Sequence, residues 1–326
     1  MNYLKQKIFG AVKDDLGDIE TALEENLTPY VELVHQTASH ILFSGGKRLR
    51  PLLMVLSARL CGYTGNYDKT FSTIFEYLHA ATLLHDDLVD GAKLRRGKPV
   101  AHSIWGSPVA VLVGDFLLSR SLSIGTETGR LKIIKVIAET TENMSQGEIH
   151  QLTRKGNIDL SESEYLEIIR RKTAVLIEGA CRTGALIADA ATEEEAGLSA
   201  YGFNLGMAFQ MADDLLDYTS DTGSLGKEIG ADLKEGKLTL PVIRSLKAAT
   251  PEDRTWIETI LANKDFSLRG FEKLRDMLDA YGGLDYTRNK AIKYVSDAKA
   301  AISVFARSET KEILLNIADY ALERDA

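Results

Sequence analysis

Two short segments of the chain carry six aspartates with the same spacing. Residues 86–90 read DDLVD and residues 213–217 read DDLLD, so each is a DDxxD motif. On a helix, side chains four positions apart share a face, which places Asp86 beside Asp90 and repeats the arrangement in the second motif. Three carboxylates within five residues repel one another, so a cation is expected to bind there. Magnesium prefers hard oxygen ligands and is often shared between carboxylates and substrate phosphates.

A single DDxxD is as readily explained by a solvated acidic helix face. The second copy weighs against that explanation, and so do the apolar spacers Leu88, Val89, Leu215 and Leu216. These spacers indicate that each helix is largely buried around its acidic face. We therefore expect two acidic faces that meet across a helical bundle and hold a diphosphate through metal ions.

Basic residues occur close to the acidic motifs in a chain that is acidic overall. Residues 45–51 read GGKRLRP, which places three cations beside a glycine pair at an expected helix start, where a backbone can approach phosphate closely. Further cations that fit anion capture are Arg95, Arg96, Lys172, Lys227 and Lys237. Each alone is compatible with a role in solubility, and Arg48 is the one that we assign to the protein surface.

His79 precedes Asp86 by seven residues, two helical turns, and is expected to face the same way. His85 lies on another face, and we expect it to be an ordinary polar residue. The chain has no His/Cys spacing typical of zinc, and it lacks a GxSxG elbow, a P-loop and a GxGxxG fingerprint.

The elements that must position these residues are predicted to be helices. The chain has only 6 prolines and none between Val109 and Leu240, and proline is the residue that helix interiors tolerate least. Apolar residues follow helical spacing, for example across 71–78, and clean alternation is scarce. Ser161 with Glu164, and Thr192 with Glu195, have the spacing of a helix capping box. We predict an all-α fold in a single domain, 1–326, with a division near Thr250 as the alternative.

Composition excludes several classes of protein. Hydrophobic residues make up 44% and charged ones 26%, which is typical of a globular chain. The net charge of −8 disfavours a nucleic-acid binder. Two cysteines fit a reducing compartment. We expect no signal peptide and no membrane-spanning helix, since the longest apolar stretch, 108–118, contains Gly114 and Asp115. The predicted location is the cytoplasm.

Taken together, the motifs resemble those of the trans (E-type) polyprenyl diphosphate synthases. The resemblance rests on six segments in family order: GGKRLRP, LLHDDLVDGAKLRRGKP, QGEIHQ, RKTAVLI, AFQMADDLLD and GKEIGADLKEGKLTLP. It implies a single large bundle of long helices around a central cavity. It also implies head-to-tail condensation of isopentenyl diphosphate with an allylic diphosphate, and a homodimer.

The same resemblance implies roles for individual positions. The metal-binding aspartates would be Asp86, Asp87, Asp90, Asp213, Asp214 and Asp217, with Mg²⁺ bridging to the allylic diphosphate. The diphosphate of isopentenyl diphosphate would be bound by Lys47, Arg50, His79 and Arg96. The allylic diphosphate would be held by Arg95, Lys172, Lys227 and Lys237. Thr173 and Gln210 match a polar pair near the developing carbocation, so the catalytic set is Lys172, Thr173 and Gln210.

Product length is expected to depend on Ala81 and Thr82, which precede the first motif. Short-chain relatives often carry bulky aromatic residues at these two positions, whereas both residues here are small. We therefore predict a medium-to-long product, about octaprenyl, with geranylgeranyl diphosphate as the alternative. The first motif lacks the two extra residues of many bacterial farnesyl diphosphate synthases, which disfavours that product.

Three other functions remain to be weighed. A terpene cyclase also uses DDxxD and magnesium, but it needs neither an intact second DDxxD nor the GGKRLRP segment. A non-catalytic partner subunit of a heteromeric synthase generally loses its acidic motifs, and both are present here. A purely structural helical bundle would leave six clustered aspartates and their matching cations unexplained.

Overall fold

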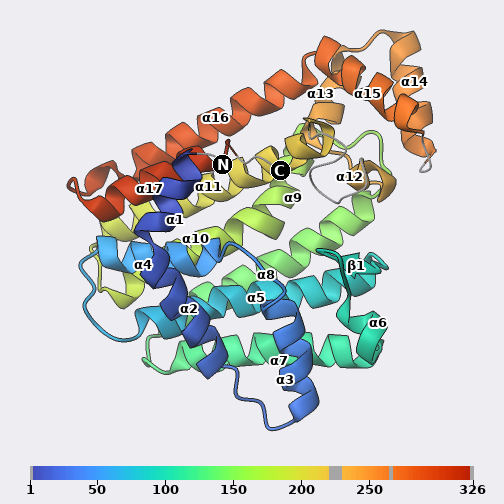
Figure 1. The fold of residues 1–326 in the computed structure, drawn as a ribbon. Helices are drawn as coiled ribbons and strands as arrows, with labels where there is room; N and C mark the ends of the chain where they lie inside the picture. The colour runs from blue at the N-terminus through green and yellow to red at the C-terminus, as the bar shows by residue number, and fades with distance from the viewer. Residues whose placement is uncertain (1–2, 220–229, 264–266, 324–326) are drawn as a thin grey trace. The chain divides into compact units, whose positions relative to one another are not determined.

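The chain folds almost entirely into helices (Figure 1). The computed structural model describes residues 3–219, 230–263 and 267–323. Over these ranges the only strands are two of two residues each, β1 (Leu94–Arg95) and β2 (Lys98–Pro99), which pair in an antiparallel hairpin. The predicted all-α class is confirmed.

The chain divides into two compact units. Unit 1 comprises Met1–Glu142, Leu176–Gly202 and Ala301–Ile317. Unit 2 comprises Asn143–Val175, Phe203–Ala300 and Ala318–Ala326. Thr250 lies in the interior of the second segment of unit 2, so no boundary between the units falls at the alternative division. The single domain 1–326 stays a prediction.

Unit 1 is a set of helices packed around α5 (Asp68–Val89). Its other elements are α1 (Tyr3–Ala11), α2 (Lys13–Glu25), α3 (Glu32–Leu42), α4 (Leu49–Leu60), the β1–β2 hairpin, α6 (Ala101–Trp105), α7 (Ser107–Thr126), the first part of α8 (Leu131–Arg154), α10 (Val175–Ile187), the start of α11 (Thr192–Thr219), the short 3₁₀ turn η2 (Ile302–Val304) and most of α17 (Glu309–Tyr320). Helices α4 and α7 pack along α5. The predicted apolar face of α5 is buried, with Phe71, Ile74 and Phe75 fully shielded from solvent.

Prolines mark the beginnings of helices. Pro51 lies in the first turn of α4, Pro108 in that of α7, Pro241 in that of α13 (Leu240–Ala248) and Pro251 in that of α14 (Pro251–Ala262). A first turn has no intrahelical partner for its N–H groups, so proline costs nothing there.

Helix α7 corrects one expectation. Gly114 and Asp115 do not interrupt it, so it runs for 20 residues and is long and apolar enough, by length and composition, to span a membrane. Within the described residues it is the one helix that passes this test. In unit 1 its buried residues, such as Val113 and Leu117, pack toward α5.

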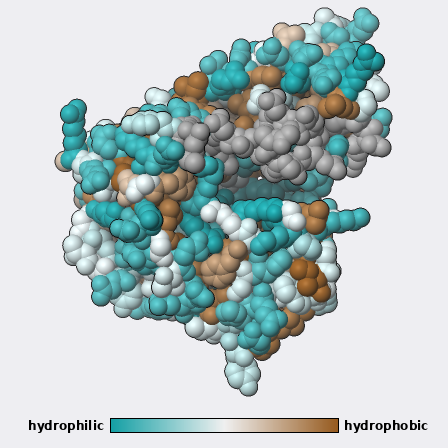
Figure 2. Space-filling model, in the orientation of Figure 1, coloured by the Kyte–Doolittle hydropathy of each residue, from teal (hydrophilic) through white to brown (hydrophobic). Residues whose placement is uncertain are grey.

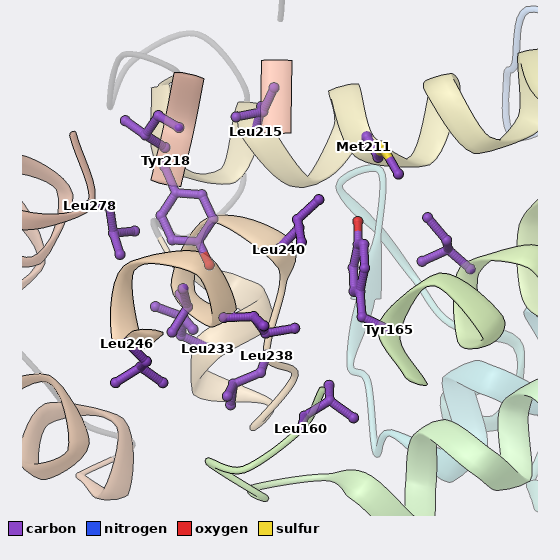
Figure 3. Close-up of a cluster of buried hydrophobic side chains, with 14 of the residues drawn as sticks. Leu160, Tyr165, Met211, Leu215, Tyr218, Leu233, Leu238, Leu240, Leu246 and Leu278 are labelled. Carbon is purple, nitrogen blue, oxygen red and sulfur yellow. The ribbon is translucent and has the colours of Figure 1, made fainter. Parts of the chain in front are cut away.

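Unit 2 has its own apolar core. Its elements are the end of α8, α9 (Glu162–Ile169), the π-helical turn η1 (Arg170–Ala174), most of α11, α12 (Ala231–Lys234), α13, α14, α15 (Leu268–Ala280) and α16 (Gly283–Ala301). Figure 3 shows part of this core, where Leu240 extends toward α11 and Leu238 lies beside Leu233. Tyr165 stands at the edge of the cluster with its hydroxyl oxygen directed toward α11.

Two helix starts, that of α9 in unit 2 and that of α11 in unit 1, test the two capping predictions. At α9 the capping box is confirmed, since the Ser161 hydroxyl accepts from the Glu164 N–H and the Glu164 carboxylate accepts from the Ser161 N–H. At α11 the predicted pairing of Thr192 with Glu195 is wrong, because the carboxylate that accepts from the backbone belongs to the preceding glutamate. The Glu194 carboxylate accepts from the Ala191 N–H, and Glu195 instead pairs with Arg182.

One face of the molecule is mostly polar. On the face drawn in Figure 2, hydrophilic residues predominate and hydrophobic ones form small separate patches. Both cysteines are free thiols, Cys61 half-buried and Cys181 buried.

Candidate active site

The first acidic motif forms the last turn of α5 in unit 1. Asp86 and Asp90 are half-buried, while Asp87 is only 3% exposed. Asp90 caps the helix, its N–H donating to the Asp86 carbonyl. The C-terminal end of a helix carries partial negative charge, so it destabilises carboxylates there. This adds a second reason, beyond mutual repulsion, for the motif to bind a cation.

The buried member of this motif is neutralised by Arg95. The guanidinium of Arg95 donates from Nε to both Asp87 oxygens, at 2.9 and 3.0 Å, and from Nη2 to Oδ1 at 2.7 Å. Arg95 lies in strand β1, and the turn that follows contains Arg96 and Gly97 with φ values of 52° and 76°. A two-residue hairpin with positive φ at both positions is a type I′ turn. The hairpin therefore fixes Arg95 against α5 and holds Arg96 in an unusual conformation.

The GGKRLRP segment lies at the start of α4, as predicted, and its three cations differ in burial. Lys47 is exposed and Arg50 is half-buried. The assignment of Arg48 to the surface is wrong, because its side chain is 5% exposed. It is buried at low cost because its guanidinium donates to Glu20 and Glu76, at 2.6 and 2.7 Å.

The electrostatics around His79 favour its neutral form. Burial lowers the pKa of His79 well below its usual value, and the guanidinium groups of Arg50, Arg95, Arg96 and Arg48 lower it further. Four predicted site residues are thus brought into one electrostatic neighbourhood with Arg48. A neutral imidazole can donate a hydrogen bond to an anion from one ring nitrogen and accept a hydrogen bond from a neighbouring cation at the other.

In unit 2 the second acidic motif repeats the pattern of the first. It lies in the last turns of α11, with Asp213 and Asp217 half-buried and Asp214 4% exposed. Burial raises the pKa of Asp214 to about 8, with repulsion from Asp232 as the next cause. Hydrogen bonds from Tyr165 and Gln210 act in the opposite direction but do not prevail.

A directional chain of hydrogen bonds leads away from Asp214. Gln210 Nε2 donates to Asp214 Oδ1 at 2.8 Å, which leaves the amide oxygen of Gln210 to accept from the Thr173 hydroxyl at 2.7 Å. The proton of Thr173 is thereby committed to Gln210, so its oxygen lone pairs remain for other partners. The structure brings the predicted polar pair together.

Local backbone geometry positions Lys172 and Thr173. Both lie in the π-helical turn η1, and π-bulges within helices are frequent at functional sites. Two glycines allow this wider turn to fit. A Cβ at Gly147 would lie 2.9 Å from the backbone nitrogen of Lys172, and one at Gly206 would lie 2.5 Å from the Ala174 Cα.

A pocket of about 120 Å³ in unit 2 unites most of the predicted residues of that unit. Its lining includes Lys172, Thr173, Gln210, Asp214 and Lys237. Lys172 also forms an ion pair with Glu148. The remaining predicted cation, Lys227, lies outside the described residues.

Several lining residues were not predicted as site residues. Among them are Tyr165, Asp232, Arg154 and Lys155. Asp232 stands inside the GKEIGADLKEGKLTLP segment, so the motif itself was a usable signal. Tyr165 carried none, because its partner Asp214 is 49 positions away.

The donor chemistry of both motifs fits a divalent cation. Carboxylate oxygens are the ligands that Mg²⁺ and Ca²⁺ prefer, and a bound cation would offset both the burial and the repulsion from Asp232 that raise the pKa of Asp214. Within the described parts of the chain, no three His, Cys, Asp or Glu side chains are placed to hold a metal by themselves. Mg²⁺ usually takes one or two carboxylates together with water and phosphate oxygens.

Comparison with known proteins decides the family. The polyprenyl synthetase family model matches residues 31–278. The chain belongs to the polyprenyl synthetase family. It is 38% identical to octaprenyl diphosphate synthase of Escherichia coli (strain K12), over 98% of this chain and 99% of that one. It is 34% identical to geranylgeranyl diphosphate synthase of Methanosarcina mazei, over 96% and 97% of the two chains.

A solved structure supports the same conclusion. Polyprenyl synthase from Caulobacter crescentus CB15, complexed with calcium and isoprenyl diphosphate, superposes with a TM-score of 0.91 at 37% identity, covering 98% of each chain. The predicted family is thus confirmed. This synthase is an enzyme, a trans-prenyltransferase that elongates prenyl diphosphates, and the family uses isoprenyl diphosphate substrates.

Proposed function

We propose that this synthase condenses isopentenyl diphosphate with an allylic diphosphate, using Mg²⁺, to a product of about octaprenyl length. The observation that carries the proposal is the hydrogen-bonded series Thr173–Gln210–Asp214 in a pocket that also contains Lys172 and Lys237. This pocket combines groups that can stabilise a cation with groups that can bind an anion, and ionisation of an allylic diphosphate requires both.

The leaving group is assigned to the acidic motifs and their cations. Magnesium, when bound, neutralises the negative charge that collects on the departing diphosphate. We assign its binding to the six aspartates of the two motifs. Arg95, Lys172, Lys237 and, by the motif match, Lys227 are assigned to the diphosphate oxygens.

We assign stabilisation of the carbocation to Thr173 and Gln210. Breaking the allylic C–O bond leaves a delocalised cation, and the lone pairs of the Thr173 oxygen offer it partial negative charge without a nucleophile strong enough to trap it. The double bond of isopentenyl diphosphate then attacks the cation, forming the new C–C bond. The departed diphosphate takes the proton that is lost, since no side chain is an obvious dedicated base.

Isopentenyl diphosphate is assigned to the cations around His79. Lys47, Arg50 and Arg96 supply positive charge, and the neutral imidazole supplies a hydrogen bond. A hydrogen bond to a charged group contributes about 1.5–3 kcal/mol, so several are needed to fix the diphosphate in place.

We assign control of the product length to residues on the face of α5 that precedes the first motif. Ala81 is buried and Thr82 is half-buried, with its hydroxyl bonded to the His79 carbonyl. Below Thr82 the same face carries Leu78 and Phe75, four and seven residues away. With a rise of about 1.5 Å per residue, Phe75 lies roughly 17 Å along the helix axis from Asp86, against about 6 Å for Thr82. An extended chain of eight isoprene units is longer than this distance, so a product of about octaprenyl length has to pass beyond Phe75.

Assembly and location remain predictions. We expect a homodimer, for which the exposed apolar side chains of α7, among them Leu112, provide a candidate contact face. We expect the enzyme to act in the cytoplasm. Light scattering coupled to size exclusion tests the first prediction, and cell fractionation tests the second.

One incubation tests the proposal as a whole. Purified protein receives isopentenyl diphosphate and farnesyl diphosphate with Mg²⁺, with Ca²⁺ or with EDTA, and released diphosphate and prenyl products are measured. We expect Mg²⁺-dependent extension to about eight isoprene units. Cyclic hydrocarbon alone would indicate a cyclase, a C20 product would select geranylgeranyl diphosphate, and turnover only with an added subunit would indicate a partner protein.

A further inference from the structure

The middle cation of the GGKRLRP segment is not placed to bind substrate. Every nitrogen of the Arg48 guanidinium donates to the protein: Nε to Glu20 at 2.6 Å, Nη1 to Glu76 at 2.7 Å, and Nη2 to Glu20 at 3.1 Å and to the Leu42 carbonyl at 2.7 Å. The side chain is 5% exposed. Arg48 therefore has a role different from that of Lys47 and Arg50.

These bonds tie the loop before α4 to three other elements of unit 1. Glu20 lies on α2, Leu42 is the last residue of α3, and Glu76 lies on α5. Glu76 is itself 8% exposed, so Arg48 and Glu76 neutralise each other in the interior. Removal of either would leave an uncompensated buried charge.

The backbone of Arg48 also needs to be held. Its φ of 48° and ψ of 34° lie in the left-handed region, which residues other than glycine rarely adopt, and Arg48 is the N-cap residue of α4. Such a conformation persists only where surrounding contacts enforce it. The four hydrogen bonds of the side chain provide that enforcement.

Another cation from a distant segment lies against the same loop. A Cβ at Gly46 would lie 3.4 Å from Arg96 Nη1 and 3.6 Å from Arg48 Nη1, so both guanidinium groups flank Gly46. Like charges this close repel each other. Glu76 interacts electrostatically with both arginines and offsets the repulsion.

We propose that Arg48 and Glu76 form a positioning pair for the binding of isopentenyl diphosphate. The pair holds the 45–50 loop against α5 so that Lys47 and Arg50 are presented together with Arg96. The inference rests on the proposed function, which assigns these three cations to that diphosphate. Misplacement of binding groups by about 1 Å can cost about a hundredfold in rate, so an anchor of this kind has a measurable effect.

Steady-state kinetics on the full-length enzyme, with each substrate varied in turn, tests the proposal. In Arg48→Met and in Glu76→Gln we expect the KM for isopentenyl diphosphate to rise about tenfold or more. The KM for the allylic diphosphate should stay within about twofold, a split that a general loss of structure does not produce. Arg48→Lys keeps the charge but not the fork of donors, so it should recover part of the affinity.

The matched control is Arg59→Met. Arg59 also belongs to α4 and forms an ion pair, with Asp15, but it is 43% exposed and lies outside the predicted site. We expect it to leave both KM values unchanged. If Arg48→Met does not fold, Arg48→Lys and Glu20→Gln, which affects the half-exposed partner, carry the test with the same criterion.

Three outcomes distinguish a failure of this inference from a failure of the proposed function. An active wild type together with folded Arg48→Met and Glu76→Gln whose KM for isopentenyl diphosphate is unchanged would overturn the inference alone. So would a parallel rise of both KM values in variants that keep their helical signal. A wild type that does not consume isopentenyl diphosphate would overturn the proposed function, and the inference with it.

Discussion

The hydroxyl of Tyr165 donates a 2.6 Å hydrogen bond to Oδ2 of Asp214, and both residues are buried. Gln210 donates to the other oxygen of the same carboxylate. The buried member of the second acidic motif is thus held from two sides, and its orientation determines that of Gln210 and Thr173.

Removal of the Tyr165 hydroxyl should therefore affect catalysis more than folding. In Tyr165→Phe we expect kcat to fall about ten- to hundredfold, because removing one partner of a buried hydrogen bond costs about 1–3 kcal/mol. Diphosphate release under saturating substrates provides the measurement. Tyr286→Phe is the control, since its hydroxyl also bonds a carboxylate of unit 2, that of Glu162, outside the pocket. Equal losses in the two variants would contradict the assigned role.

The acidic motifs should be needed for turnover but not for the fold. We expect Asp86→Ala and Asp213→Ala to lower turnover by at least about a thousandfold, because charge stabilisation of the leaving group is a large catalytic contribution. Far-UV circular dichroism should be unchanged, since both residues are half-buried at helix ends. Asp276→Ala, at a 71% exposed position in α15, serves as the control. Near-normal activity in both motif variants would exclude the metal assignment.

Product length should respond to the face of α5 below Asp86. We expect Thr82→Phe and Ala81→Phe to shorten the product, because a phenyl ring there would block the path of the growing chain. Phe75→Ala should lengthen it for the opposite reason. Chromatography of the dephosphorylated prenyl alcohols provides the measurement, with Thr21→Phe, on an exposed face of α2, as the control. An unchanged distribution in all three variants would place the limit elsewhere in the protein.

The pH dependence of stability should reveal the neutral state of His79. Its pKa is lowered in the folded protein, so below about pH 6.5 only the unfolded chain takes up this proton, and folding loses stability as pH falls. Between pH 7.5 and pH 5.5 this residue should therefore lower the free energy of unfolding. Urea unfolding at both pH values should show a smaller loss in His79→Gln, with His150→Gln as the control. A loss as large in His79→Gln as in the wild type would contradict the burial of a neutral imidazole.

Much of the site could be predicted from local spacing alone. The positions four apart in DDLVD and DDLLD, the glycines before Lys47 and the prolines in first turns all act within one or two helical turns. The quoted motifs extended this to a family, and the comparisons confirmed it. Lys227 and the division of roles among the cations stay predictions.

Only the tertiary structure decided which charges are neutralised internally. The sequence predicts Arg48 at the surface because any one basic residue alone is compatible with a role in solubility, yet Glu20 and Glu76, each 28 positions away, pair with it in the interior. Tyr165 gave no signal because its partner lies on another helix. Helical periodicity is a property of neighbouring residues, whereas the pairing of buried polar groups depends on which helices pack together. The sequence therefore determined where the reactive groups stand along each helix, and packing determined which of them are held internally by other side chains.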